Sequence, residues 1–456
     1  MKANPTLNFA IFTATLMVSW HALAATTLTP SAFLSLSKTN STTSLTISNA
    51  GDQAWVVQSS SNLTSWAEVE SLKIHNGIFR RSYTNAGAAN FYYRAFYDAA
   101  RQTNSSATTN ALLLPGTAHN YAAPVLPASF SVNPILAQDN TPTNNPVTDN
   151  GATLGRVLFY DKRLSTNQTI SCSSCHQQAH GFSDPRRFSV GFDGSVGTRN
   201  SMSLSHARWY QRRNFFWDER AASLEEQTLM PIQNPIEMGM TLQALTNRLA
   251  AEPFYTNLFA KTFGTTEINT NRISRALAQF VRSIIATASK YDVGVTNNFA
   301  NFTTQENLGR QIFLGQVGNP PATCAACHGT DNFVPGPAIN NNGLEFPFVD
   351  KGLGGITGLT TDEGKFKVPS LRNIELTAPY MHDGRFTNLE QVVEFYNSGV
   401  VDNPNLSPPL RVPGGNVLRL NLTTVQKAAL VAFLKTLTDP NLATDVKCSD
   451  PFNYGN

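Results

Sequence analysis

Cysteine and histidine are scarce in this sequence of 456 residues, which contains five of the former and eight of the latter. The formal net charge is only +3 and no long basic run occurs, which argues against nucleic acid as a partner. Beyond the first 24 residues there is no long uncharged apolar run, so no transmembrane segment is expected after that point. A hydrophobic content of 41% gives no sign of a fibrous or disordered class. Function must therefore be sought in a few chemically distinctive positions.

Four of the five cysteines lie in two short runs, Cys172-Ser-Ser-Cys175-His176 and Cys324-Ala-Ala-Cys327-His328. Both match C-x-x-C-H, in which two thiols bond to one porphyrin and the histidine ligates its iron from one face. A four-thiolate zinc site is the alternative, but it would need the two pairs closer together and has no use for the histidines. The sequence therefore predicts two covalently bound haem c groups, attached through Cys172, Cys175, Cys324 and Cys327, with His176 and His328 as iron ligands.

The first 24 residues have the features of a secretory signal peptide. Lys2 precedes an apolar stretch from Leu7 to Val18, and Ala22-Leu-Ala24 is a small-residue cleavage pattern. An uncleaved anchor is the alternative, but the stretch is too short to span a bilayer comfortably. The fifth cysteine, Cys448, is interpreted as structural or incidental rather than as a reactive thiol.

Residues 26–98 are predicted to form a small all-β domain. Short alternating runs, such as 44–47, 54–57 and 91–96, are separated by small polar clusters. The one histidine in this region, His75, is interpreted as a surface residue. Residues 99–146 are rich in Asn, Thr, Ala and Pro, and are predicted to be a linker that wraps onto a neighbouring domain.

The rest of the chain is predicted to be mainly α-helical. One apolar helical stripe contains Ile273, Leu277, Phe280, Val281, Ile284 and Ile285. Three capping boxes are expected to open helices, and they pair Thr303 with Glu306, Thr387 with Glu390 and Thr423 with Gln426. Because each haem motif lies in or beside loops between such helices, two mostly α-helical haem lobes are expected, at 147–298 and 299–453.

Six further blocks of sequence surround the haem motifs in a fixed order: Leu154–Asp161, Phe216–Arg220, Ser223–Gln227, Pro235–Met238, Val368–Asn373 and Ala378–Gly384. Over roughly 124–452 the chain thereby resembles the bacterial di-haem cytochrome c peroxidases and their relative MauG. The resemblance implies a periplasmic enzyme with two cytochrome c-like lobes, a peroxidatic first lobe and an electron-transferring second lobe. A generic di-haem electron carrier would match the two haem motifs alone.

The same resemblance assigns roles to three residues near the first haem. Glu237 matches the distal glutamate that carries a proton between the two peroxide oxygens, and partial desolvation would raise its pKa into a useful range. Gln227 matches the glutamine that orients peroxide, and Trp217 matches the aromatic residue that relays electrons between the haems. The alternatives are a surface carboxylate for Glu237 and an ordinary buried aromatic for Trp217. Glu219 departs from the pattern, because many relatives have glycine there.

The loop 188–200 after the first haem motif contains no histidine. Peroxidases that must be reduced before they work resemble one another in carrying a second histidine in this loop. His180 is too near His176 to reach the opposite face of the ring, and His206 lies beyond the loop. We therefore expect a first haem that is five-coordinate or water-bound, and active without prior reduction.

The second haem is expected to have a different second ligand. Tyr396 stands fourteen residues after His382, where electron-transferring peroxidases place a methionine and MauG a tyrosine. A phenolate stabilises oxidised iron and lowers its reduction potential. Tyr396 shares a helical face with Leu389, Val392 and Val393, which predicts that its ring points inward. The alternative is that Tyr396 is a core aromatic and that Met381 or another residue is the ligand.

A calcium ion between the lobes is also implied by the resemblance. It would be held by the side chain of Asn200 and by the backbone carbonyls of Thr377 and Pro379. Oxygen donors of this kind suit a hard cation.

The leading hypothesis for function is a periplasmic di-haem peroxidase that reduces hydrogen peroxide to water with electrons from a small cytochrome c or cupredoxin. A second hypothesis, favoured by Tyr396, is a MauG-like oxidase that modifies side chains of a partner protein. A third is a non-catalytic di-haem electron carrier. It predicts no peroxide turnover, and Glu237 and Gln227 argue against it.

Overall fold

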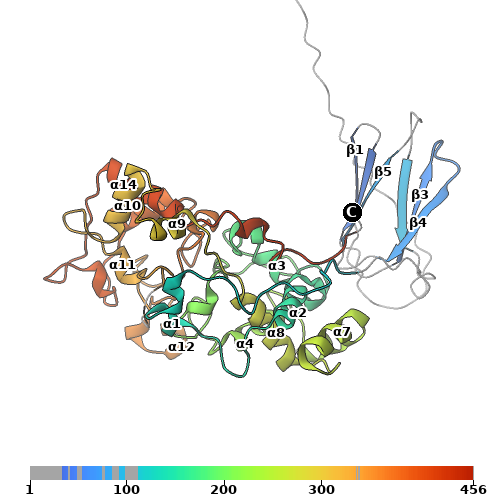
Figure 1. Cartoon of the computed structure of the whole chain (residues 1–456), viewed down its shortest axis with the longest axis horizontal. Helices are drawn as coiled ribbons and strands as arrows, with labels where there is room; N and C mark the ends of the chain where they lie inside the picture. The colour runs from blue at the N-terminus through green and yellow to red at the C-terminus, as the bar shows by residue number, and fades with distance from the viewer. Residues whose placement is uncertain are drawn as a thin grey trace, which may run out of the picture.

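The computed structural model describes residues 33–39, 42–48, 54–73, 78–84, 92–97, 111–334, 336 and 339–454. The predicted signal peptide, 1–24, and His75 lie outside these residues. Figure 1 shows the β strands at one end of the molecule and a helical body beside them. No helix in the described ranges has both the length and the apolar character needed to cross a membrane.

The N-terminal strands form two small antiparallel sheets of three strands each, as expected for an all-β region. One sheet has the order β1-β2-β5 and the other β4-β3-β6. In β2 buried and half-buried residues alternate, which places Leu45 and Ile47 in a small core with Val57, Phe79 and Ala95. The bounds are β1 (Phe33–Thr39), β2 (Thr42–Ser48), β3 (Ala54–Ser60), β4 (Ala67–Lys73), β5 (Ile78–Thr84) and β6 (Tyr92–Tyr97).

The helical body consists of several helices of two to four turns joined by long loops and single turns. The longer helices are α2 (Asp149–Tyr160), α6 (Leu242–Ala250), α7 (Pro253–Phe263), α8 (Thr270–Arg282), α9 (Lys290–Thr296), α10 (Thr304–Phe313), α13 (Leu389–Glu394) and α14 (Thr424–Lys435). The single turns are α1 (Ile135–Gln138), α3 (Cys172–Cys175), α4 (Leu224–Gln227), α5 (Met230–Gln233), α11 (Cys324–Cys327) and α12 (Gly354–Thr357).

Two of the three predicted capping boxes are confirmed. Thr303 caps α10 and Thr423 caps α14, each reciprocally with the residue three positions on. The third prediction, Thr387 with Glu390, is wrong by one residue. Asn388 caps α13, and its side chain accepts a hydrogen bond from the backbone of Gln391 at 2.9 Å. Asparagine is the stronger N-cap residue, which explains the shift.

The predicted apolar stripe lies on α8, but it extends past the end of that helix. Ile273, Leu277, Phe280 and Val281 are buried within α8. The helix ends at Arg282, so Ile284 and Ile285 belong to the segment that follows it. Ile284 is nevertheless buried in the same core.

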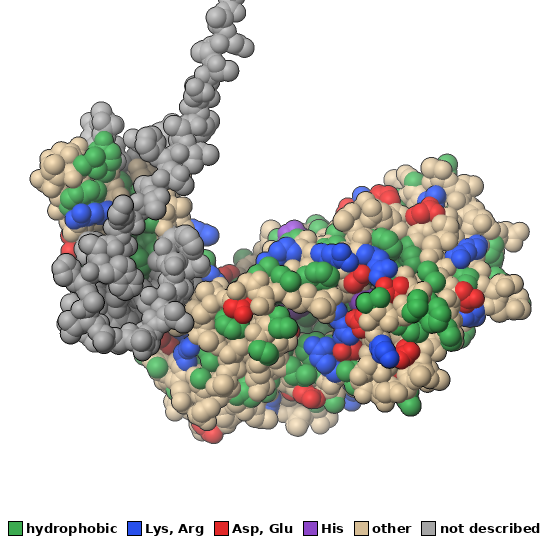
Figure 2. Space-filling view, turned by 180° about the vertical axis from the view of Figure 1, so that it is seen from behind, with side chains coloured by type: hydrophobic (Ala, Val, Ile, Leu, Met, Phe, Trp, Pro, Cys, Tyr) green, Lys and Arg blue, Asp and Glu red, His purple; other side chains and the backbone are tan. Residues whose placement is uncertain are grey.

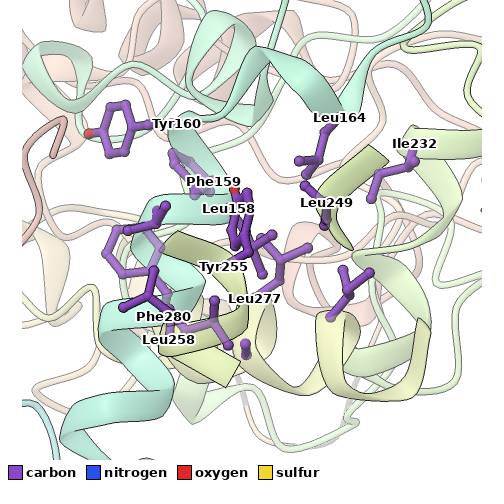
Figure 3. Packing of buried hydrophobic residues seen from close by; sticks show 14 of the residues in the cluster. Leu158, Phe159, Tyr160, Leu164, Ile232, Leu249, Tyr255, Leu258, Leu277 and Phe280 are labelled. Carbon is purple, nitrogen blue, oxygen red and sulfur yellow. The ribbon is translucent and has the colours of Figure 1, made fainter. Parts of the chain in front are cut away.

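The body has two large hydrophobic cores. The first is built mainly from α2, α6, α7 and α8, and Figure 3 shows Leu158, Tyr255, Leu277 and Phe280 directed into it. The second is built from α10, α13 and α14 and contains Ile312, Phe433 and other buried apolar side chains. The C-terminal segment returns to the first core, where Leu442, Cys448 and Phe452 are buried.

The two cores repeat one helix contact. Gly155 of α2 lies against α8, so that a Cβ atom there would be 2.0 Å from the carbonyl oxygen of Ala276. Gly309 of α10 lies against α14 in the same way, with 1.9 Å to the carbonyl oxygen of Ala429. Both glycines stand between leucine and arginine, in Leu154-Gly-Arg and Leu308-Gly-Arg. The two cores thus share one feature, a glycine that allows two helices to touch backbone to backbone.

Replacing Gly155 by alanine is expected to destabilise the protein by about 1–3 kcal/mol, because the added methyl group would force α2 and α8 apart. Urea unfolding followed by circular dichroism measures the change in the free energy of unfolding. Gly116→Ala is the matched control, since an added Cβ at Gly116 meets no atom within 4 Å. Equal free energies of unfolding for Gly155→Ala and Gly116→Ala would contradict the close contact between α2 and α8.

The described part of the predicted linker lies along the body. Phe130 and Ile135 pack against Trp209, and the Tyr121 hydroxyl donates a hydrogen bond to the carbonyl of Lys447 at 2.6 Å. Residues 111–113 run antiparallel to 451–453, with a backbone hydrogen bond from Leu113 to Pro451 of 2.7 Å. The backbone amide of Arg80, in β5, donates to the carbonyl of Tyr454 at 2.6 Å. The C-terminal segment thus joins the sheets to the body (Figure 1).

The surface carries charges of both signs. On the face shown in Figure 2, Lys and Arg side chains are interspersed with Asp and Glu along the body. Several charged side chains of the body form ion pairs, including Arg199 with Asp218 at 2.6 Å and with Asp350 at 2.7 Å.

Candidate active site

The first haem motif opens onto a large cavity beside the first core. Its empty space, open mouth included, is about 1640 Å³. Cys172 and Cys175 reach its wall from α3, a single helical turn, and His176 follows directly. The side chains predicted to act on peroxide, Glu237 and Gln227, line the same cavity. The structure therefore brings these five predicted residues together.

The second haem motif opens onto a second cavity of similar size, about 1680 Å³ with its mouth. Cys324 and Cys327 reach its wall from α11, and His328 follows. Phe366, Leu430 and other apolar residues form most of the remaining lining. Because the two cysteine pairs line separate cavities, the four-thiolate zinc alternative is wrong.

The two motif histidines are held in the same way. Nδ1 of His176 lies 3.0 Å from the carbonyl oxygen of Phe182, and Nδ1 of His328 lies 3.3 Å from that of Phe333. A hydrogen bond from Nδ1–H to a carbonyl leaves the Nε2 lone pair free for a metal. Burial lowers the pKa of both imidazoles, that of His328 to about 4, so both rings are neutral. Neutral imidazole is the form that ligates iron.

Each cavity thus has the donor set that haem c needs. The four motif cysteines are free thiols, and each pair adjoins a neutral histidine whose ring is already oriented by a backbone carbonyl. Much of the wall around each set is apolar, which suits a porphyrin. The residues present therefore fit two covalently bound porphyrins.

Trp217 lies in the wall between the two cavities and lines both of them. Its indole Nε1–H donates a hydrogen bond of 2.8 Å to the carbonyl of Asn200, which fixes the ring. Asn200 and Lys367 also line both cavities. The backbone amide of Lys367 donates to the carbonyl of Trp217 at 2.8 Å. Lys367 is a site residue that the sequence analysis missed, since it stands 150 positions beyond Trp217.

Glu237 has the environment of a proton carrier. Burial raises the pKa of its carboxyl above the ordinary glutamate value, although nearby Arg220 and a hydrogen bond from Asn234 oppose the shift. The Asn234 amide donates to Oε1 at 2.8 Å and holds the group in place. Arg220, which also lines the cavity, lies 3.6 Å above the ring of Phe216 and pairs with Asp218 at 3.0 Å. A carboxyl whose pKa is raised by burial is more readily protonated than an exposed glutamate, as a proton carrier needs.

Two histidines line the first cavity among the described residues, His176 and His206. Both ring nitrogens of His206 are engaged: Nδ1 lies 2.8 Å from Oδ1 of Asn332, and Nε2 accepts from the amide of Ala286 at 2.9 Å. Burial lowers the pKa of His206 to about 3. His180 is outside the lining residues of this cavity. His206 thus serves as a structural link between segments.

Tyr396 and Met381 both line the second cavity. Tyr396 belongs to a π-helical turn, η8 (Phe395–Gly399), directly after α13, and its expected neighbours Leu389, Val392 and Val393 line the cavity with it. Such turns often occur at functional sites. The side-chain amide of Asn342 lies 3.5 Å from both the Tyr396 hydroxyl and the Met381 sulfur. Burial raises the pKa of Tyr396 to about 12, and the Asn342 contact opposes that rise.

Asn200, Thr377 and Pro379, the residues expected to hold calcium, all line the second cavity. The side-chain nitrogen Nδ2 of Asn200 donates hydrogen bonds to the backbone carbonyls of Arg186 at 2.9 Å and Arg187 at 3.2 Å. These bonds orient the side chain and leave its oxygen as a donor for a cation. Calcium binding stays a prediction.

Comparisons with known proteins agree with this geometry. Residues 149–299 match the family model described as di-haem cytochrome c peroxidase. The chain is 34% identical to cytochrome c551 peroxidase of Nitrosomonas europaea over 70% of its own length and 86% of that protein. It is 30% identical to the methylamine utilization protein MauG of Methylophilus methylotrophus, over 65% of its length and 84% of that protein.

A solved structure, that of a MauG-like protein associated with microbial copper homeostasis, is also similar. It is 35% identical and superimposes with a TM-score of 0.61, over 71% of this chain and 99% of that one. Di-haem cytochrome c peroxidases are oxidoreductases, and their cofactors are two covalently bound haem c groups. The chain therefore belongs to the family of di-haem cytochrome c peroxidases and MauG proteins.

Proposed function

We propose that this protein is a periplasmic di-haem peroxidase that reduces hydrogen peroxide to water with electrons from a small redox protein, a cytochrome c or a cupredoxin. The observation that carries the proposal is the buried carboxyl of Glu237 in the same cavity as the first haem motif. A passive electron carrier has no use for a proton-carrying acid at that place. The predicted signal peptide supports export.

When bound through Cys172, Cys175 and His176, the first haem would supply the iron chemistry that cleaves the O–O bond of peroxide. Glu237 takes the proton from one peroxide oxygen and returns it to the other, so that water leaves rather than hydroxide. Gln227 orients the peroxide by hydrogen bonding. Trp217 adjoins both cavities and carries electrons between them. Two electrons and two protons in all convert one peroxide into two waters.

We further propose that the two cores are haem lobes of the cytochrome c type, at 147–298 and 299–453. The repeated glycine contact and the repeated histidine-to-carbonyl hydrogen bond support a common unit. Calcium held by Asn200, Thr377 and Pro379 would join the lobes, since Asn200 belongs to the first and the other two to the second.

The first haem is expected to be five-coordinate or water-bound before any reduction. This expectation rests on the loop 188–200, which has no histidine, and on His206, whose two ring nitrogens already have partners. The resting ferric protein should therefore show a high-spin component in its absorption and electron paramagnetic resonance (EPR) spectra. A first haem with the low-spin spectrum of two histidine ligands would contradict it.

A MauG-like oxidase, acting on side chains of a partner protein, is the second candidate. The position of Tyr396 on the second cavity favours it. A phenolate ligand would give the second haem a low reduction potential, which makes it a poor acceptor from a high-potential cytochrome. Such a haem is better suited to sharing oxidising equivalents with its partner haem.

One experiment separates the two candidates. The purified holoenzyme is mixed with peroxide, with and without reduced cytochrome c, and the haem spectrum is followed. Fast oxidation of the cytochrome supports the peroxidase. A long-lived oxidised haem spectrum with slow cytochrome turnover supports the MauG-like oxidase, and no spectral response to peroxide would contradict both.

A further inference from the structure

Glu219 has a backbone conformation that glutamate rarely adopts. Its φ angle is +57°, in the left-handed region that glycine enters without strain. Here a larger residue accepts the strain, and strained residues often mark functional sites.

The carboxylate of Glu219 is buried and fully engaged. It accepts a hydrogen bond from the hydroxyl of Tyr210. Nε of Arg212 donates to its two oxygens at 2.8 and 2.7 Å. The Glu219 side chain has no exposed surface, and Tyr210 is 1% exposed. The result is a phenol whose proton already points at a carboxylate, in a place that water does not reach.

This pair adjoins the first cavity. Tyr210 lines it together with Trp217, and the ammonium group of Lys367 lies 4.2 Å from the centre of the Tyr210 ring. Burial and the Glu219 charge raise the pKa of Tyr210 far above its ordinary value, so the phenol keeps its proton at rest. A cation above the ring opposes any positive charge on it. Tyr210 can therefore lose an electron only if its proton leaves as well.

We propose that Tyr210 is an oxidisable residue of the first site, with Glu219 as the acceptor of its proton. Peroxide first oxidises the first haem. The phenol of Tyr210 would then give one electron to that haem, and its O–H proton would pass to the Glu219 carboxylate. The products are a neutral tyrosyl radical, a protonated carboxyl and a haem reduced by one electron. Arg212 holds the carboxylate in place. This inference rests on the proposed reaction with peroxide.

The chain contains a natural control. The hydroxyl of Tyr255 donates a hydrogen bond to the carboxylate of Asp161, and this phenol–carboxylate pair is equally buried. Neither Tyr255 nor Asp161 belongs to the residues that line the two cavities. If a buried pair alone were enough, both tyrosines would be oxidised. If contact with the first cavity is also needed, only Tyr210 of these two tyrosines would be oxidised.

The test uses the di-haem holoenzyme, mixed with a few equivalents of peroxide and frozen within milliseconds for EPR. The optical change at the haem is recorded first, and the radical yield is expressed per haem that responds. Ring-deuterated tyrosine should narrow the radical signal in the unmodified protein, which needs no variant. Tyr210→Phe should lower the yield at least tenfold, Glu219→Gln should lower it severalfold, and Tyr255→Phe should leave it unchanged.

The possible failures can be told apart. A normal optical response to peroxide without a tyrosyl signal, or with a signal that survives in Tyr210→Phe, overturns the inference and leaves the proposed function standing. An absent optical response overturns the proposed function, and this inference with it.

Discussion

Replacing Glu237 by glutamine is expected to lower the rate of peroxide reduction by about 100- to 10,000-fold, the usual contribution of a positioned acid–base group. Glutamine preserves the size of the side chain and its contact with Asn234, but it cannot take up and release a proton. The rate is measured from the oxidation of reduced cytochrome c by peroxide. The haem content of both proteins is determined from their absorption, so that loss of haem is not mistaken for loss of catalysis.

Glu267→Gln is the matched control for this substitution, because the Glu267 side chain is 63% exposed and is absent from the lining of both cavities. It should keep the full rate. The pH profile gives an independent check. Since burial raises the pKa of Glu237, the carboxylate that accepts the first proton disappears at a higher pH than in an exposed glutamate. The rate should therefore rise with pH through that raised pKa, and Glu237→Gln should abolish this limb.

Replacing Tyr396 by methionine is expected to raise the reduction potential of the second haem by on the order of hundreds of millivolts, within the roughly 0.8 V range that axial ligands control. A thioether favours reduced iron, whereas a phenolate favours oxidised iron. The potential is measured by spectroelectrochemical titration of the holoenzyme. The same substitution should speed electron uptake from reduced cytochrome c, since the second haem would become a better acceptor.

Two further variants decide between Tyr396 and Met381 as the ligand. Met381→Leu should leave the potential nearly unchanged if Tyr396 is the ligand, and should lower it if the Met381 sulfur is. Tyr380→Phe is the control for loss of a tyrosine from the same cavity, because the Tyr380 hydroxyl donates to the carbonyl of Ile374 at 2.9 Å. An unchanged potential in Tyr396→Met, together with a changed one in Met381→Leu, would refute the assignment.

The parts of the site that were predictable from the sequence are those encoded by short spacings. The C-x-x-C-H runs fix the thiols and the histidine within five residues, and α3 and α11 place them on the cavity walls. The helical spacing from Leu389 to Tyr396 predicted that these side chains share one face of a helix. Tyr396 lies in the π-helical turn after α13, and its side chain lines the second cavity together with that of Leu389. The repeat of Leu-Gly-Arg at Leu154 and Leu308 is likewise encoded in a short stretch of sequence.

The parts that were not predictable depend on contacts between distant segments or on backbone conformation. Asn342 contacts Tyr396 across 54 positions, and nothing local marks it as a site residue. Lys367 reaches the wall between the cavities because its backbone amide is hydrogen-bonded to the carbonyl of Trp217. The role of Glu219 depends on a left-handed turn that composition does not reveal. The capping error at Thr387 has a local cause, since two adjacent residues could each cap the helix.

The hydrogen bond from Arg80 to Tyr454 has a consequence for biosynthesis. The ribosome makes the β strands before residues 451–454, so the segment to which Arg80 is hydrogen-bonded does not yet exist while the intervening helical body is being made. Until then the sheets are stabilised by their own small hydrophobic core, which consists of Leu45, Ile47, Val57, Phe79 and Ala95. Attachment of the sheets to the body through this contact therefore cannot precede synthesis of residues 451–454.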